Sequence, residues 1–234
     1  MAHAEAGGRE GHPRPTLLSD FILGSQDGLV NVLGILLGLV AAGTTTRIIL
    51  VAAFAALAAE TISMGAVAYT TTLSRRNLFL SEVERERREM REVPEAEREE
   101  VRVILRGWDF EGEEVEEMVR RIESKPKAWL ELMMAFELNL SEILPDQPRN
   151  SGLIVLSATA LGSVIPLVPF LVGLSNELAA IVAVVLSAIT LGAVGVYEAR
   201  TTVGPLWLGA ARMLLIGLGA GFAGFLIGRI VPIL

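Results

Sequence analysis

Two long apolar stretches precede a single charged stretch in this chain, and three more follow it. Five stretches are almost free of charged side chains, and each exceeds the roughly 20 helical residues that cross about 30 Å of hydrocarbon. They cover residues 17–42, 48–73, 153–174, 177–199 and 206–231. This pattern predicts an all-α membrane protein with five transmembrane helices. Residues 1–16 are polar, with glycine and proline but no apolar run, so we expect a disordered tail and not a signal peptide.

The charged stretch, residues 74–150, separates the second span from the third. It holds 20 of the 27 acidic residues and 14 of the 20 basic residues, which is incompatible with burial in lipid. Its first part, "SEVERERREMREVPEAEREEVR", alternates in sign as solvated helices do. Pro94 should end one helix there and let another begin. Because further helices are expected at 113–124 and 126–141, the sequence predicts a three- to four-helix domain inserted between spans two and three.

Composition agrees with a membrane protein and narrows the possible functions. Hydrophobic residues make up 52% of the chain, and the mean hydropathy is +0.52. The formal net charge of −7 argues against a nucleic-acid partner. The chain has no cysteine, which excludes disulfides and thiolate metal sites. It also has no Walker-type phosphate loop, so we do not expect this chain to use ATP directly.

Arginines that flank the spans predict the orientation in the membrane. Arg75 and Arg76 open the charged stretch and Arg200 follows the fourth span, whereas only Arg47 and Arg229 lie on the other side. This excess places the N-terminus and the charged domain in the cytoplasm, with the C-terminus outside. The sequence shows no eukaryotic sorting signal, so we expect a prokaryotic plasma membrane.

Four residues inside the first two spans have chemistry that lipid does not tolerate or that metals favour. Asp27 lies about two turns into the first span with Asn31 one turn further, and Met64 is one turn beyond Glu60 in the second span. A carboxylate there costs about 3 kcal/mol or more unless it faces protein or water, so these residues are candidates for a cation path. Structural alternatives are a hydrogen bond near the membrane boundary for Asp27 and a protonated carboxyl packed between helices for Glu60.

Glycines recur at four-residue spacing in the first and fifth spans, which permits close helix contact within a protomer or across a dimer. The pairs are Gly24/Gly28, Gly34/Gly38, Gly217/Gly221 and Gly224/Gly228. We expect the glycines of the first span to support a homodimer. In the third span, Pro166 and Pro169 predict a kink or a break.

The inserted domain carries carboxylates and methionines at helical spacing on three predicted helices. The candidate metal ligands are Glu86, Glu89, Glu97, Glu100, Met133, Met134 and Glu137. If the three helices pack together, four or five carboxylates converge with two thioethers. Such a mixed set favours a first-row transition ion such as Fe²⁺. The alternative is a solvated acidic bundle with both methionines in its core.

Five spans with an acidic helical domain after the second resemble the vacuolar iron transporter family. The motifs that carry the resemblance are "QDGLVNVLGILLGL", "ETISMGAVAYTTT", "ERERREMREVPEAEREE", "AWLELMMAFELNL", "IPLVPFL" and "ARMLLIGLGAGFAGFLIGR". They cover nearly the whole chain apart from the N-terminal tail. The "MM…EL" segment after two Glu-x-x-Glu pairs is the most specific of them.

The resemblance implies export of Fe²⁺, and often of Mn²⁺, Co²⁺ and Zn²⁺, from the cytosol against protons. It also implies a homodimer whose ion path lies between the two copies of the first span, and a cytoplasmic domain that collects metal. The seven candidate ligands match the pattern of the family's cytoplasmic site, and Asp27 and Met64 match its path. Asn31 and Glu60 are candidates from this sequence alone, and we expect no prosthetic group.

Two other classes of protein share some of these features. A membrane-anchored metal buffer or sensor would use the acidic domain alone, but it has no use for carboxylates inside the membrane. A di-iron oxidase would need Glu-x-x-His motifs, and the only histidines, His3 and His12, lie in the tail. We therefore expect a transporter and not an enzyme, with coupling to protons or to sodium left open.

Overall fold

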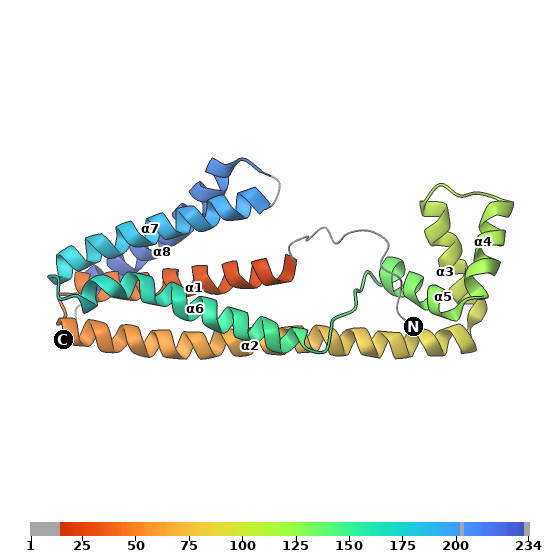
Figure 1. The fold of residues 1–234 in the computed structure, drawn as a ribbon, viewed down its shortest axis with the longest axis horizontal. Helices are drawn as coiled ribbons and strands as arrows, with labels where there is room; N and C mark the ends of the chain where they lie inside the picture. Colours follow the sequence, from red (N-terminus) through yellow and green to blue (C-terminus); the bar gives the residue numbers. More distant parts are fainter. Residues whose placement is uncertain (1–14, 202–203, 232–234) are drawn as a thin grey trace, which may run out of the picture. The chain divides into compact units, whose positions relative to one another are not determined.

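The computed structural model describes residues 15–201 and 204–231, which form eight α-helices and one π-helix and contain no strand (Figure 1). The elements are α1 (Pro15–Ala41), α2 (Thr46–Glu92), α3 (Pro94–Gly107), α4 (Glu113–Glu123), α5 (Pro126–Leu132), η1 (Met133–Glu137), α6 (Gln147–Leu171), α7 (Asn176–Thr201) and α8 (Leu206–Ile230). Within these described residues, five helices are long and apolar enough to cross a membrane: α1, α2, α6, α7 and α8. They agree with the five predicted spans. The expected tail lies outside the described residues as far as residue 14, and residues 15 and 16 already belong to α1.

The chain divides into two compact units, and the boundary falls inside α2. The first unit is Met1–Tyr69 with Arg149–Leu234, and the second is Thr70–Pro148. Helix α2 has 47 residues, which at 1.5 Å each is about 70 Å and roughly twice the thickness of the hydrocarbon layer. The charged C-terminal half of α2, which belongs to the second unit, therefore extends beyond a single crossing.

In the first unit, glycines let α1 approach two other helices closely. A Cβ atom on Gly24 would lie 2.6 Å from the carbonyl oxygen of Val155 in α6, and one on Gly38 would lie 3.0 Å from that of Gly224 in α8. The first distance is too short for any side chain, so Gly24 requires glycine, and the second leaves a methyl group at position 38 very little room. The glycines of α1 therefore allow close contacts within the protomer, and their expected part in a homodimer stays a prediction.

A hydrophobic core joins α1, α2, α6 and α7 in the first unit. Helix α6 contributes Leu167 and Phe170, which are both buried, to this core. The helix is continuous through Pro166 and Pro169, so of the expected kink or break the break does not occur, and the kink stays a prediction. Packing holds the residues beside both prolines in place, and membrane helices tolerate proline where neighbouring groups compensate for the lost hydrogen bonds.

The second unit is a small helical domain with its own core. Helix α2 ends at Glu92 and α3 begins at Pro94, as predicted, because proline fits the first turn of a helix but not its interior. Helices α3 and α4 are amphipathic, and they bury Val101, Leu105, Val115 and Val119 with Trp129 of α5 and Met133 of η1. This core positions the acidic faces of α2, α3 and η1.

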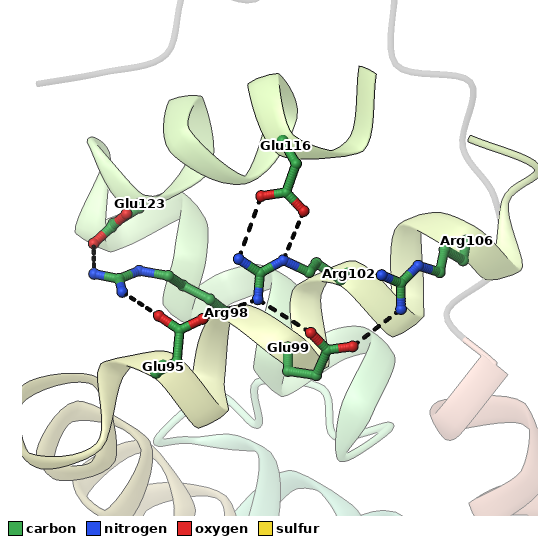
Figure 2. A network of polar contacts seen from close by, with 7 residues as sticks. All are labelled: Glu95, Arg98, Glu99, Arg102, Arg106, Glu116 and Glu123. Carbon is green, nitrogen blue, oxygen red and sulfur yellow. Dashed lines mark hydrogen bonds and ion pairs between the residues drawn. The ribbon is translucent and has the colours of Figure 1, made fainter. Parts of the chain in front are cut away.

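Arginines of α3 tie that helix to α4 through a network of ion pairs (Figure 2). Arg102 binds Glu116 with two hydrogen bonds, from Nε to Oε1 at 2.9 Å and from Nη2 to Oε2 at 3.3 Å. Arg98 donates from Nη2 to Glu123 Oε1 at 2.6 Å. Glu95 and Glu99 of α3 complete the network on the same arginines. Two-pronged arginine–carboxylate contacts fix orientation, so the network sets how α3 lies against α4.

The last helix of the second unit differs from its prediction. It was expected at 126–141, but α5 ends at Leu132 and a single π-helical turn, η1, follows as far as Glu137. The amide of Leu138 donates to the carbonyl of Met133 at 3.2 Å, which is the wide π-type spacing. Asn139 then adopts a φ of 51°, which stops the helix. Single π-turns often accompany functional sites, and this one contains all three candidate ligands of the segment.

Candidate functional site

Three carboxylates of the second unit meet where α2 faces α3. Glu86 and Glu89 of α2 and Glu97 of α3 each place one oxygen within 4.8 Å of the others, and we call them the carboxylate cluster. Glu86 is only 1% exposed and Glu97 only 3%. In each of these two residues, Oε2 is buried and has no hydrogen-bond partner among the described residues. Buried carboxylate oxygens without partners are costly, and either a proton or a cation relieves that cost.

Burial also changes the proton affinity of the cluster. It raises the pKa of Glu97 to about 8, and the charges of Glu100 and Glu86 add to this effect. Burial likewise raises the pKa of Glu86, with the charge of Glu89 next in importance. Glu97 is therefore mostly protonated at neutral pH. A divalent cation that binds here must displace a proton, so ion and proton compete for the same oxygens.

Glu100 and Glu137 interact electrostatically with the cluster, and their role as metal ligands stays a prediction. Turn η1 packs on α3, the helix that carries Glu97 and Glu100. Partial burial raises the pKa of Glu137 to about 7, and the charges of Glu100 and Glu86 follow as causes. Since those charges act on Glu137, the five predicted carboxylates belong to one electrostatic unit. Oxygen-rich sites of this kind suit hard or borderline divalent ions.

One arginine at the cluster was missed by the sequence reasoning. Arg85 Nη2 lies 3.8 Å from Glu86 Oε1, and Arg85 Nε lies 3.5 Å from Glu89 Oε2. Its Nη1 is also 3.0 Å from Glu82. The i,i+4 spacing of Arg85 and Glu89 is a signal that the sequence offered. Arg85 partly neutralises the carboxylates, so an incoming cation competes with it as well as with protons.

The two methionines are both buried, and one of them clearly has a packing role. Met133 is fully buried and belongs to the apolar core with Val101, Leu105 and Trp129. Met134 is 4% exposed and lies outside that core cluster. Packing thus accounts for Met133 without a metal ion. The prediction that thioethers bind metal stays a prediction for both residues, and Met134 is the better candidate.

In the first unit, Asn31 of α1 connects the two carboxylates predicted for the ion path. Its Nδ2 donates to Asp27 Oδ1 at 3.3 Å on the same helix and also to Glu60 Oε1 of α2. Helix α1 begins at Pro15, so Asp27 lies about three turns from its start. Glu60 and Met64 are one turn apart on α2, and both are half-buried. The structure therefore brings Asp27, Asn31 and Glu60 together, with Met64 next to them along the helix.

Comparisons with known proteins agree across most of the chain. The model of the VIT family matches residues 18–229. A vacuolar iron transporter 1 from Eucalyptus grandis is 32% identical over 209 residues, which are 89% of this chain and 84% of the relative. One from Arabidopsis thaliana is also 32% identical, over 92% of this chain and 86% of the relative. A vacuolar iron transporter from Plasmodium falciparum is 28% identical over 92% of this chain and 82% of the relative.

These matches include every helix that could cross a membrane, and together they identify an integral membrane protein of a transporter family. They also agree with the resemblance of the sequence motifs. The chain therefore belongs to the VIT family, and the relatives described here carry the name vacuolar iron transporter.

Proposed function

We propose that this protein exports Fe²⁺ and related divalent ions, among them Mn²⁺, Co²⁺ and Zn²⁺, from the cytosol in exchange for protons. The observation that carries this proposal is the set of Asp27, Asn31 and Glu60, joined by hydrogen bonds within membrane-spanning segments. Polar groups in such segments are costly and usually belong to an ion pathway. A carboxylate there can hold either a cation or a proton, which is the requirement for exchange.

The second unit would collect the ions on the cytosolic side. Its carboxylates raise the local concentration of cations, and the buried oxygens of Glu86 and Glu97 replace part of an ion's hydration shell. Glu97 and Glu137 have pKa values of about 8 and 7, so ion binding there is linked to proton release at cytosolic pH. The orientation with this unit in the cytosol follows from the arginine excess.

A homodimer would complete the ion path. Asn31 is exposed in the single chain although it lies within a spanning helix. It borders an otherwise apolar groove of about 510 Å³ between α1, α2 and α8, which Ile35, Ala52 and Gly228 also line. A polar side chain that faces lipid costs free energy even when part of it is hydrogen-bonded, and a second protomer would remove that cost by covering it.

The substitution Asp27→Asn tests the transport proposal. It keeps the shape of the side chain but removes its charge, so Fe²⁺ flux into proteoliposomes should fall to the background of empty vesicles. Asp20→Asn is the matched control, because Asp20 lies two turns earlier on the same helix and should leave flux intact. Binding of Fe²⁺ by the whole protein should survive Asp27→Asn, since the carboxylate cluster is unchanged. Wild-type flux in Asp27→Asn would refute the assigned path.

The alternative, a membrane-anchored metal buffer or sensor, predicts that binding occurs without any flux. The dimer can be tested separately, because the chain has no cysteine. Ile35→Cys, in the groove, should form a disulfide between protomers in native membranes. Ile189→Cys, which is 65% exposed on α7, should not. Equal crosslinking at both positions would contradict an interface at this groove.

A further inference from the structure

The second unit contains a cavity that none of the candidate metal ligands lines. It has a volume of about 480 Å³ and lies between the end of α2, the end of α4 and α5. The charged residues that line it are Arg87, Arg91, Lys127 and Glu123. Cavities of this size bind small organic molecules. The excess of cationic groups makes a divalent metal ion an unsuitable occupant.

The positive charge of the cavity is poorly neutralised. Among the described residues, Arg91 has no ion-pair partner. Arg87 is 3.9 Å from Glu84, and Lys127 is 3.6 Å from Glu131, and all four side chains are more than half exposed. Exposed ion pairs at such distances are weak, so the side chains of Arg87 and Lys127 can leave their glutamates and bind a ligand instead.

The acidic residue of the cavity is already bound elsewhere. Glu123 accepts a hydrogen bond of 2.6 Å from Arg98 of α3, as Figure 2 shows. Its charge is therefore largely neutralised by an arginine that does not line the cavity. The net effect is a site with two arginines and one lysine that face an unfilled space. Arginine forks match the oxygens of a phosphate group.

The remaining wall of the cavity is apolar and includes an unpartnered donor. Met90 and Leu130 supply aliphatic surface, and Trp129 supplies an aromatic ring that is only 4% exposed. The indole Nε1 of Trp129 is buried and has no hydrogen-bond acceptor among the described residues. Buried tryptophan N–H groups normally have an acceptor, so Trp129 brings an unused donor to the same part of the domain as the three cationic groups.

We propose that this cavity binds a small phosphomonoester, with the phosphate held by Arg87, Arg91 and Lys127 and an apolar group held against Met90 and Trp129. The dianionic phosphate balances the cationic charge, and the apolar wall selects an ester over inorganic phosphate. A soluble metabolite and the headgroup of an anionic lipid with a terminal phosphate share this chemistry. The site is separate from the carboxylate cluster and goes beyond ion transport.

Phenyl phosphate is a suitable probe for the full-length protein in discs of neutral lipid, with a chelator present to remove divalent ions. In a Trp108→Phe/Trp207→Phe background, Trp129 is the only remaining tryptophan, so its emission reports on the cavity wall. We expect phenyl phosphate to change this emission saturably and to bind more weakly as salt increases. Inorganic phosphate should bind less tightly, and phenol should not bind.

Arg87→Gln/Arg91→Gln should weaken phenyl phosphate by roughly tenfold or more, because two charge-assisted contacts are lost. Arg88→Gln/Arg120→Gln removes the same charge from exposed positions outside the cavity and should change the affinity less than about twofold, a difference of under 0.5 kcal/mol. Circular dichroism establishes that both variants are folded. Equal weakening in the two variants, or no saturable binding of phenyl phosphate or phosphatidic acid, would overturn the proposal.

A second arm identifies the source of the phosphate. Discs that contain phosphatidic acid are compared with neutral discs, again by Trp129 emission. The ligand is a lipid headgroup if phosphatidic acid by itself changes the Trp129 emission and prevents phenyl phosphate from binding. In that case it should have neither effect on the Arg87→Gln/Arg91→Gln variant. If phenyl phosphate binds equally in both kinds of disc, the ligand is a soluble ester.

Discussion

Glu97→Gln should change two properties of the second unit in opposite directions. It should increase the free energy of unfolding without metal, and it should weaken the binding of divalent ions. Glu97 is 3% exposed, and its pKa is raised from 4.5 to about 8, chiefly by burial. At neutral pH it is mostly protonated, and glutamine has nearly the same shape as this neutral acid. The substitution should therefore leave the packing between α2 and α3 intact while it removes one ionisable oxygen from the candidate metal site.

The sign of the effect on stability follows from the direction of the pKa shift. Between pH 4.5 and about 8, the folded domain retains a proton that the unfolded chain releases. The free energy of unfolding without metal should thus fall as pH rises through this window, by up to about 1.4 kcal/mol per pH unit. By pH 7 the loss is on the order of 3 kcal/mol as an upper limit, since neighbouring carboxylates titrate with Glu97. Glu97→Gln removes this loss and should be more stable than the wild type at pH 7 and above.

Denaturant unfolding of the full-length protein in lipid discs measures this difference. A Trp207→Phe background leaves Trp108 and Trp129, both in the second unit, as reporters. With divalent ions present, the wild type should become more stable than the variant. The reason is that Fe²⁺ (under anaerobic conditions) and Zn²⁺ should bind the variant with an affinity about tenfold lower, or lower still. Glu114→Gln, an exposed position on α4, should change neither quantity. A variant that is less stable than the wild type at pH 8, or that retains full metal affinity, would refute the reasoning.

Three further predictions address the ligands and the helix packing. Met133→Leu/Met134→Leu should preserve the fold, because leucine has a volume similar to that of methionine. Calorimetric titration of this variant should show weaker binding of Fe²⁺ and Zn²⁺ and unchanged binding of Mg²⁺. An unchanged affinity for Fe²⁺ would mean that both methionines serve only in packing. The affinity of the protein for Zn²⁺ should rise between about pH 6 and pH 8 and then level off, because Glu137 and Glu97 lose protons there, and a flat profile in the same titration would contradict competition between ion and proton. Gly224→Ala should lower the melting temperature because its methyl group would collide with the carbonyl oxygen of Gly34, whereas Gly219→Ala on the same helix meets no atom within 4 Å and should not lower it.

The sequence predicted the helices well where one periodic pattern dominates. The five spans and the boundary at Pro94 follow from apolar length and from the chemistry of proline, and both are local signals. The π-turn at Met133–Glu137 could not be predicted, because its wide hydrogen bonds depend on packing against α3. The unbroken course of α6 through two prolines likewise depends on neighbouring helices.

The candidate sites show the same division between local and long-range information. The spacing of Glu86 and Glu89 placed them on one face of α2. The structure adds that Glu97, on the neighbouring helix α3, lies close to both of them. The glycine pairs of α1 were recognised as contact faces, but four-residue spacing does not say which helix they contact. Asn31 was placed beside Asp27 by its spacing, whereas its hydrogen bond to Glu60 requires the arrangement of two helices.

Simultaneous recording of ion and proton flux tests the central claim most directly. The unsubstituted protein is reconstituted into liposomes, Fe²⁺ is added outside under anaerobic conditions, and two dyes follow Fe²⁺ and pH in the lumen. Exchange predicts that Fe²⁺ enters while the lumen becomes more alkaline, and that the lumenal pH stays constant when Fe²⁺ is omitted. Fe²⁺ that binds without entering, or that enters without any change of lumenal pH, would contradict proton-coupled transport.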